Sequence, residues 1–200
     1  MQSVMQAVLR RIRVHGRGWV FTPKNFVDIG NRGATDMALT RFTEIGTIRR
    51  LARGLYDYPR VHPKLGMLAP NPDEVAKALA TKDGSRIQVS GARAANLLGL
   101  SDQVPAQIVY LTNGRSRRVR IGAQVISLKQ AATSTFPAAG TPVGLALQAL
   151  RALGRNIDED FVVQRLAKVL THSERQKLIR LSKYAPGWSR NIFRRLKEMS

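Results

Sequence analysis

The side chains whose type and spacing best suit a chemical task are arginines. Arg49, Arg50 and Arg53 precede Gly54, an aromatic pair and a proline within the stretch FTEIGTIRRLARGLYDYPR. Guanidinium groups are permanently charged and donate hydrogen bonds in a planar fork that fits phosphate oxygens. The spacing therefore indicates a segment that binds an anion, although a solvated charged loop shows the same pattern.

The composition favours a polyanionic partner. The 200 residues include 33 Lys and Arg against 13 Asp and Glu, for a net charge of +20. Residues 1–70, 71–140 and 141–200 carry net charges of +8, +5 and +7, so the excess is not confined to a tail. A charge beyond what solubility needs favours nucleic acid first and an anionic membrane surface last.

Residues typical of catalysis are sparse. His15, His62 and His172 are far apart, and none has a carboxylate at metal-ligand spacing. The acidic run Asp158–Asp160 is expected to form the first turn of a helix. The chain has no cysteine, no phosphate-binding loop and no nucleophile-elbow motif. We therefore expect no catalytic residue, no metal and no cofactor, and a binding protein rather than an enzyme.

The same features bear on location. The absence of cysteine fits a reducing cytosol. We find neither a signal peptide nor an apolar run of about 20 residues, the length of a membrane span. The expected location is cytoplasmic and nucleoid-associated, with no membrane partner.

The elements around the arginines follow a recognisable order. Cap residues, glycines and apolar periodicity predict a helix from Ser3, a strand at Trp19–Phe21, a short helix from Thr22-Pro23, a turn at Asn31–Gly33, a helix at Thr35–Ile45 and a hairpin at Ile48–Tyr58. Ala38, Leu39, Phe42 and Ile45 are expected to share the buried face of the second long helix. This order predicts a winged helix-turn-helix.

In such a unit the second helix of the pair enters the major groove, and the hairpin, or wing, follows the phosphates. Short outward side chains let the helix approach the groove, and arginines reach phosphate or guanine. The residues expected at the DNA are Lys24, Arg32, Thr35, Asp36, Thr40, Arg41, Arg49, Arg50 and Arg53. A protein-binding winged helix, with these arginines as a solvated face, is the alternative.

Prolines between residues 59 and 72 predict a linker, which divides the chain into domains 1–65 and 71–200. The second part shows a strand at Arg86–Ser90, a short helix, two alternating runs flanking an Asn113-Gly114 hairpin turn, and helices from about Pro142. The expected fold class is α+β: an N-terminal winged helix-turn-helix followed by a mixed α/β C-terminal domain that ends in helices.

The C-terminal domain offers a second basic surface. Its residues are Arg115, Arg117, Arg118 and Arg120 on the predicted hairpin and Arg190, Arg194 and Arg195 on the last helix. A charge-protected edge strand and a solvated helix face explain the same residues, so both interpretations stay open.

Two segments resemble the AbiEi family of type IV antitoxins. They are ALTRFTEIGTIRRLARGLYDYPR and VSGARAANLLGLSDQVPAQIVYLTNGRSRRVRIG, and the resemblance covers roughly residues 1–150. It implies a repressor of its own operon that binds operator inverted repeats in double-stranded DNA through the helix Thr35–Ile45 and the wing Ile48–Tyr58. It also implies an antitoxin role in phage defence, paired functionally with a nucleotidyltransferase-like toxin without a stable complex. The alternative is an RNA-binding or non-specific nucleic-acid-binding regulator without a toxin partner.

Overall fold

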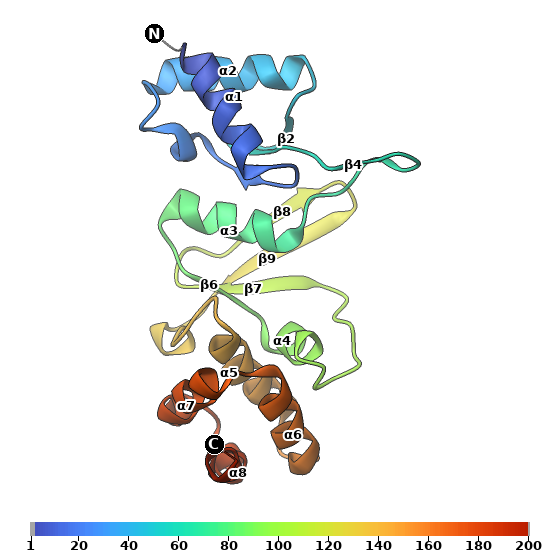
Figure 1. Ribbon diagram of the computed structural model, residues 1–200, viewed down its shortest axis with the longest axis vertical. Helices are drawn as coiled ribbons and strands as arrows, with labels where there is room; N and C mark the ends of the chain where they lie inside the picture. Colours follow the sequence, from blue (N-terminus) through green and yellow to red (C-terminus); the bar gives the residue numbers. More distant parts are fainter. Residues whose placement is uncertain (1–2, 200) are drawn as a thin grey trace. The chain divides into compact units, whose positions relative to one another are not determined.

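Helices and small sheets make up the chain in the computed structural model, which describes residues 3–199 (Figure 1). The chain has the expected α+β class. It divides into two units. The first unit contains the residues up to Ser85 together with Val119–Ile126, and the second contains Arg86–Arg118 and the residues from Ser127 onward.

The first unit begins as a winged helix-turn-helix. Its elements are α1 (Val4–His15), β1 (Val20–Phe21), the 3-10 helix η1 (Pro23–Phe26), α2 (Arg32–Glu44), β2 (Arg49–Ala52) and β3 (Leu55–Asp57). Strand β3 pairs with both β1 and β2 in an antiparallel sheet. The order of elements and the pairing of β2 with β3 are those predicted from the sequence, whereas the pairing of β1 with β3 was not predicted.

Local signals start each helix of this unit. Ser3 and Gln6 form a capping box at α1, and the Asn25 side chain accepts a hydrogen bond from the Thr22 N–H, 2.8 Å away, at η1. Asn31 Oδ1 accepts a hydrogen bond from the Ala34 N–H at 2.9 Å and caps α2. These caps set where α2 begins, and thereby which of its side chains face outward.

Apolar side chains of both long helices and of the strands form the core of the unit. One cluster of buried residues contains Val8, Ile12, Phe21, Phe26, Ala38, Leu39, Phe42 and Ile48. Ile45 was expected among them, but it is 65 % exposed. The reason is that α2 ends at Glu44, so Ile45 is its C-cap and no longer follows the helical face.

The wing turn has two residues. Ala52 pairs with Leu55, which leaves Arg53 and Gly54 as the turn. Gly54 has φ +67°, a conformation that glycine adopts without steric cost.

The segment predicted to be a linker contains a small hairpin of β4 (Val61–His62) and β5 (Gly66–Met67). Helix α3 (Pro72–Asp83) follows and belongs to the first unit. The domain limits 1–65 and 71–200 stay predictions about which parts fold independently.

The second unit is largely helical. A four-stranded sheet has the order β6-β7-β9-β8, and the residues Val119–Ile126 of its β8 and β9 group with the first unit. No helix within residues 3–199 is long and apolar enough to cross a membrane. The elements of the chain after α3 are β6 (Ile87–Val89), α4 (Gly91–Leu97), β7 (Ile108–Thr112), β8 (Arg117–Ile121), β9 (Gln124–Gln130), η2 (Thr133–Thr135), α5 (Pro142–Leu153), α6 (Glu159–Val169), α7 (His172–Arg180), η3 (Ser182–Tyr184), η4 (Gly187–Ser189) and α8 (Arg190–Glu198).

The predicted Asn113-Gly114 hairpin is wrong. Strand β7 lies between β6 and β9, whereas β8 pairs with β9, so Asn113-Gly114 does not join two paired strands. Asn113 Oδ1 instead accepts a hydrogen bond from the Arg86 N–H at 2.7 Å. The turn between β8 and β9 contains Gly122, whose φ of +58° suits a tight hairpin.

Candidate nucleic-acid interface

The outward face of α2 is polar apart from one methionine. Thr40, Arg41 and Glu44 are exposed, and Met37 is 75 % exposed. The Thr40 hydroxyl donates to the Asp36 carbonyl at 2.9 Å, which holds the side chain close to the helix. At Thr40 the surface of α2 is therefore low, between the longer side chains of Met37, Arg41 and Glu44.

Thr35 does not lie on this face, contrary to the prediction. Its side chain is 2 % exposed. In a helix, residues three, four and seven positions apart share a side, so Thr35 lies with Ala38, Leu39 and Phe42 toward the interior. Its position therefore differs from the one expected for a groove contact.

Two cations lie near the start of α2 in the sequence: Lys24 precedes the helix and Arg32 is its first residue. Lys24 is exposed on η1, and the exposed Arg32 forms an ion pair with Asp36, with Nε and Oδ2 3.4 Å apart. Because this pair is exposed, we expect it to contribute little to stability and to leave Arg32 able to exchange partners.

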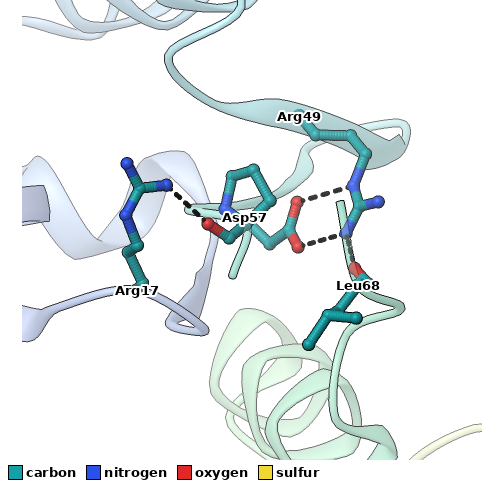
Figure 2. A network of polar contacts seen from close by, with 5 residues as sticks. Arg17, Arg49, Asp57 and Leu68 are labelled. Carbon is teal, nitrogen blue, oxygen red and sulfur yellow. Dashed lines mark hydrogen bonds and ion pairs between the residues drawn. The ribbon is translucent and has the colours of Figure 1, made fainter. Parts of the chain in front are cut away.

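Arg49 has a different role from the one expected (Figure 2). Its Nε and Nη2 donate to Oδ1 and Oδ2 of Asp57 at 3.1 and 2.7 Å, and Nη2 also donates to the Leu68 carbonyl at 2.9 Å. The Asp57 side chain is 1 % exposed. The charge of Arg49 is therefore engaged by a buried carboxylate and is not free for a phosphate, which corrects the prediction.

A neighbouring arginine supports the same corner of the sheet. Arg17 donates to the Pro59 carbonyl at 2.9 Å (Figure 2). Its guanidinium carbon lies 4.8 Å from the centre of the Tyr58 ring. This contact and the Arg49 pair fix the end of β3 and the chain that leaves it.

Arg50 and Arg53 are the exposed cations of the wing. Successive side chains of a strand point to opposite faces, so Arg50 lies on the face away from the Arg49 ion pair. The sequence analysis missed a third cation, Lys82 of α3, whose Nζ donates to the Arg53 carbonyl at 3.0 Å. The two residues are 29 positions apart, and no local pattern could link them.

Five of the nine predicted DNA-contact residues line one cavity of about 510 Å³ in the first unit. They are Lys24, Arg32, Thr35, Asp36 and Arg53, and Lys82 joins them. The structure does not bring Thr40, Arg41, Arg49 or Arg50 to this cavity.

A bidentate ion pair joins α1 to the segment between η1 and α2. Arg11 Nη1 and Nη2 donate to Oδ1 and Oδ2 of Asp28 at 2.6 and 2.7 Å, and Nη1 also donates to the Asn25 carbonyl at 2.8 Å. The hydrogen bonds from Arg11 lower the pKa of Asp28 from 3.8 to about 2. The contacts of Arg11 with Asp28 and Asn25 therefore anchor both this segment and η1, which carries Lys24.

We expect this pair to add acid sensitivity that Asp28→Asn removes. Because the folded pKa lies below the unfolded value, the contribution of Asp28 is present above about pH 4 and is lost as the pH falls toward about 2. Urea midpoints measured across this range should fall less steeply in Asp28→Asn than in the wild type. Asp102→Asn, at an exposed carboxylate without an ion pair, should keep the wild-type slope; a wild-type slope in Asp28→Asn would contradict the assignment.

Some arginines of the second basic surface contact other groups of the protein, and others are exposed. Arg118 and Arg120 are exposed on β8, while Ile121 is buried on the other face, as strand alternation predicts; Arg115 is exposed and Arg117 is half-buried.

On α8, Arg195 forms an ion pair with Asp160 of α6, Arg194 donates to Asn191 Oδ1 at 2.7 Å, and Arg190 is exposed. Asp158 caps α6 by accepting a hydrogen bond from the Phe161 N–H at 3.1 Å, which confirms the expected helix start. Within residues 3–199, no three His, Asp or Glu side chains lie close enough together to hold a metal ion.

Comparisons with known proteins give a family but no function. The model of a family of unknown function, DUF6088, matches residues 7–178. A solved structure, that of the RV2827C protein from Mycobacterium tuberculosis, is 15 % identical with a TM-score of 0.40, and the match covers 88 % of this chain and 76 % of that one. No curated protein matches the chain significantly.

Proposed function

The chain belongs to the DUF6088 family of unknown function, and we propose that it is a sequence-specific DNA-binding transcriptional repressor. The observation that carries the proposal is the exposed polar face of α2 in a winged helix-turn-helix whose wing keeps Arg50 and Arg53 exposed. A net charge of +20 supports a polyanionic partner.

Each part of this surface suits a part of the duplex. Thr40 is small and lets α2 enter the major groove, where the exposed Met37 can contact a thymine methyl group. Arg41 and the wing residues Arg50 and Arg53 supply phosphate contacts. The mixture of phosphate and base contacts is what a specific complex requires.

The resemblance to AbiEi antitoxins supports a narrower proposal. The protein represses its own operon by binding operator inverted repeats, and it acts as the antitoxin of a type IV toxin–antitoxin system in phage defence. Its functional partner is a nucleotidyltransferase-like toxin, which it neutralises without a stable complex, and it works in the cytoplasm at the nucleoid. Rescue of growth on co-expression with an adjacent nucleotidyltransferase-like gene tests this role, and no rescue would contradict it.

The repressor proposal is tested by comparing two DNA fragments. The first is the region upstream of the protein's own operon, and the second is the same fragment scrambled. Specific complexes are typically at least about 10³-fold tighter than non-specific ones. Fluorescence anisotropy at about 150 mM salt should therefore show a clear preference for the upstream fragment. Equal affinity for both fragments would overturn the proposal.

Removal of the exposed wing cations should reduce the salt dependence of binding. Each phosphate neutralised contributes about 0.9 to the slope of log affinity against log salt, so the double variant Arg50→Ala, Arg53→Ala should flatten the slope by almost 2. Affinities measured at several salt concentrations give the slope. The matched control, Arg155→Ala with Lys168→Ala, removes two exposed cations of the second unit and should keep the wild-type slope. Equal slopes in both double variants would contradict the wing assignment.

The alternative is an RNA-binding regulator without a toxin partner. Exposed Arg115, Arg118 and Arg120 favour it. A pulldown of nucleic acid with the purified chain, scored for RNA against DNA, separates the two functions. Retention of RNA in excess over DNA would favour the alternative.

A further inference from the structure

The cavity of about 510 Å³ in the first unit has features that groove binding by α2 does not use. The first turn of α2 lines it through Asn31, Arg32 and Thr35. The wing turn and Lys82 of α3 also line it. The helix η1 also contributes, through Pro23 and Lys24, so the cavity is built by segments that are distant in the sequence.

Thr35 supplies the unusual feature of this cavity. Its hydroxyl oxygen is buried and has no hydrogen-bond partner. The other two threonines of α2 behave differently, because Thr40 and Thr43 donate to the carbonyls of Asp36 and Leu39 at 2.9 and 2.8 Å. A buried hydroxyl without a hydrogen-bond partner lowers the stability of the folded state. The Thr35 hydroxyl is therefore suited to donate a hydrogen bond to a ligand.

The charge around the cavity is positive. Lys24, Arg32, Arg53 and Lys82 line it against one carboxylate, Asp36, for a net of +3. Asp36 already pairs with Arg32, with the two atoms 3.4 Å apart.

The N-terminal end of a helix adds a positive potential, and α2, with 13 residues, is long enough to present one. The side chain of Asn31, which caps α2, accepts a hydrogen bond from the Ala34 N–H. The N–H groups that precede Ala34 in the helix can donate to other acceptors.

We propose that this cavity binds a phosphoryl group. The Thr35 hydroxyl donates to one phosphate oxygen, and Lys82, Arg53 and Lys24 neutralise the charge. A phosphate alone would not fill about 510 Å³, a volume in the range of small-molecule sites, so the cavity has room for the rest of a nucleotide. Tyr56 lines the same cavity and offers an aromatic surface for a base.

The phosphoryl group has two possible sources with one chemistry. It belongs either to a free nucleotide or to the DNA backbone. The inference does not depend on the proposed repressor function, because phosphate binding at Thr35 can be measured without DNA.

The test uses inorganic phosphate and two isosteric variants of the full chain. Thermal unfolding in phosphate, compared with chloride at equal ionic strength, gives a dissociation constant from the midpoint shift. We expect phosphate to raise the midpoint of the wild type and of Thr40→Val, whose hydroxyl is engaged within the helix. In Thr35→Val the phosphate affinity should fall about tenfold or more, since a hydrogen bond to a charged group is lost.

A second measurement, the unfolding temperature without phosphate, shows whether Thr35→Val is folded. Without phosphate, Thr35→Val should unfold at or above the wild-type temperature, because the substitution removes an unpartnered buried hydroxyl. Equal phosphate affinity in Thr35→Val and the wild type would overturn the proposal. No phosphate effect beyond that of chloride in the wild type would overturn it too.

Competition identifies the source. If phosphate and adenosine 5′-monophosphate displace the upstream DNA fragment in a Thr35-dependent way, the cavity holds a backbone phosphate. If they bind in a Thr35-dependent way without displacing DNA, and adenosine does not bind, the ligand is a free nucleotide. Both outcomes support a phosphoryl site, and a competition that is unchanged by Thr35→Val would contradict it. Failure of the repressor proposal would appear separately, as equal binding of upstream and scrambled DNA.

Discussion

Arg49→Ala is expected to destabilise the first unit by about 3–5 kcal/mol, because it leaves the buried Asp57 carboxylate without its partner. The substitution also frees the Leu68 carbonyl, which Arg49 binds at 2.9 Å. Urea denaturation in a Trp188→Phe background measures this unit, because the chain has two tryptophans and Trp19 packs beside Phe21 in the first unit.

The control for this prediction is the neighbouring residue. Arg50→Ala removes the same charge from an exposed position of the same strand, and should change the unfolding free energy by less than about 0.5 kcal/mol. The double variant Arg49→Met, Asp57→Leu should recover most of the loss, since apolar replacement of a buried ion pair is often neutral. Equal stability of Arg49→Ala and Arg50→Ala would show that the ion pair is not what holds the wing.

Thr40→Glu should reduce affinity for the upstream DNA fragment at least about tenfold, or more than about 1.4 kcal/mol. The substitution places a carboxylate on the exposed face of α2, where it meets phosphates if that face enters the groove. Thr40 is exposed, so the variant should fold normally, as circular dichroism can verify. Fluorescence anisotropy at about 150 mM salt gives the affinity.

Thr81→Glu is the matched control. It makes the same change of charge at an exposed position of α3, in the same unit. A general effect of charge should be small, so its affinity should stay within about threefold of the wild type. If both glutamate variants weaken binding equally, α2 is not the groove-facing helix.

Some features set by neighbouring residues were predictable from the sequence. Gly54 in the wing turn and Asp158 before α6 act as predicted. Asn31–Gly33 was predicted to be a turn, but Asn31 caps α2, which begins at Arg32. The order of elements followed from these signals and from apolar periodicity. The winged-helix order of elements could therefore be predicted from the sequence alone.

Features that join distant residues were not predictable. The Arg49 contact with Leu68 spans 19 positions, and the Lys82 contact with Arg53 spans 29. Sequence reasoning assigned all three wing arginines to phosphate because it cannot tell which of them lies over a buried carboxylate. Strand pairing failed for the same reason, since β9 rather than β8 is the neighbour of β7.

Thr35 is a different kind of error. Its spacing from Ala38, Leu39 and Phe42 already placed it on the buried side of α2. A small polar residue type predicts exposure, and at Thr35 that prediction is wrong. The position of that hydroxyl, buried and without a partner, is what makes the adjoining cavity a candidate site.

The most direct test of the central claim is amide hydrogen exchange of the full chain with and without the upstream DNA fragment. If the winged-helix surface binds the operator, protection should increase in α2 (Arg32–Glu44) and at the wing turn between β2 and β3. The scrambled fragment at the same concentration should give less protection there. Protection confined to β8 (Arg117–Ile121) or α8 (Arg190–Glu198), with α2 and the wing unchanged, would contradict the account.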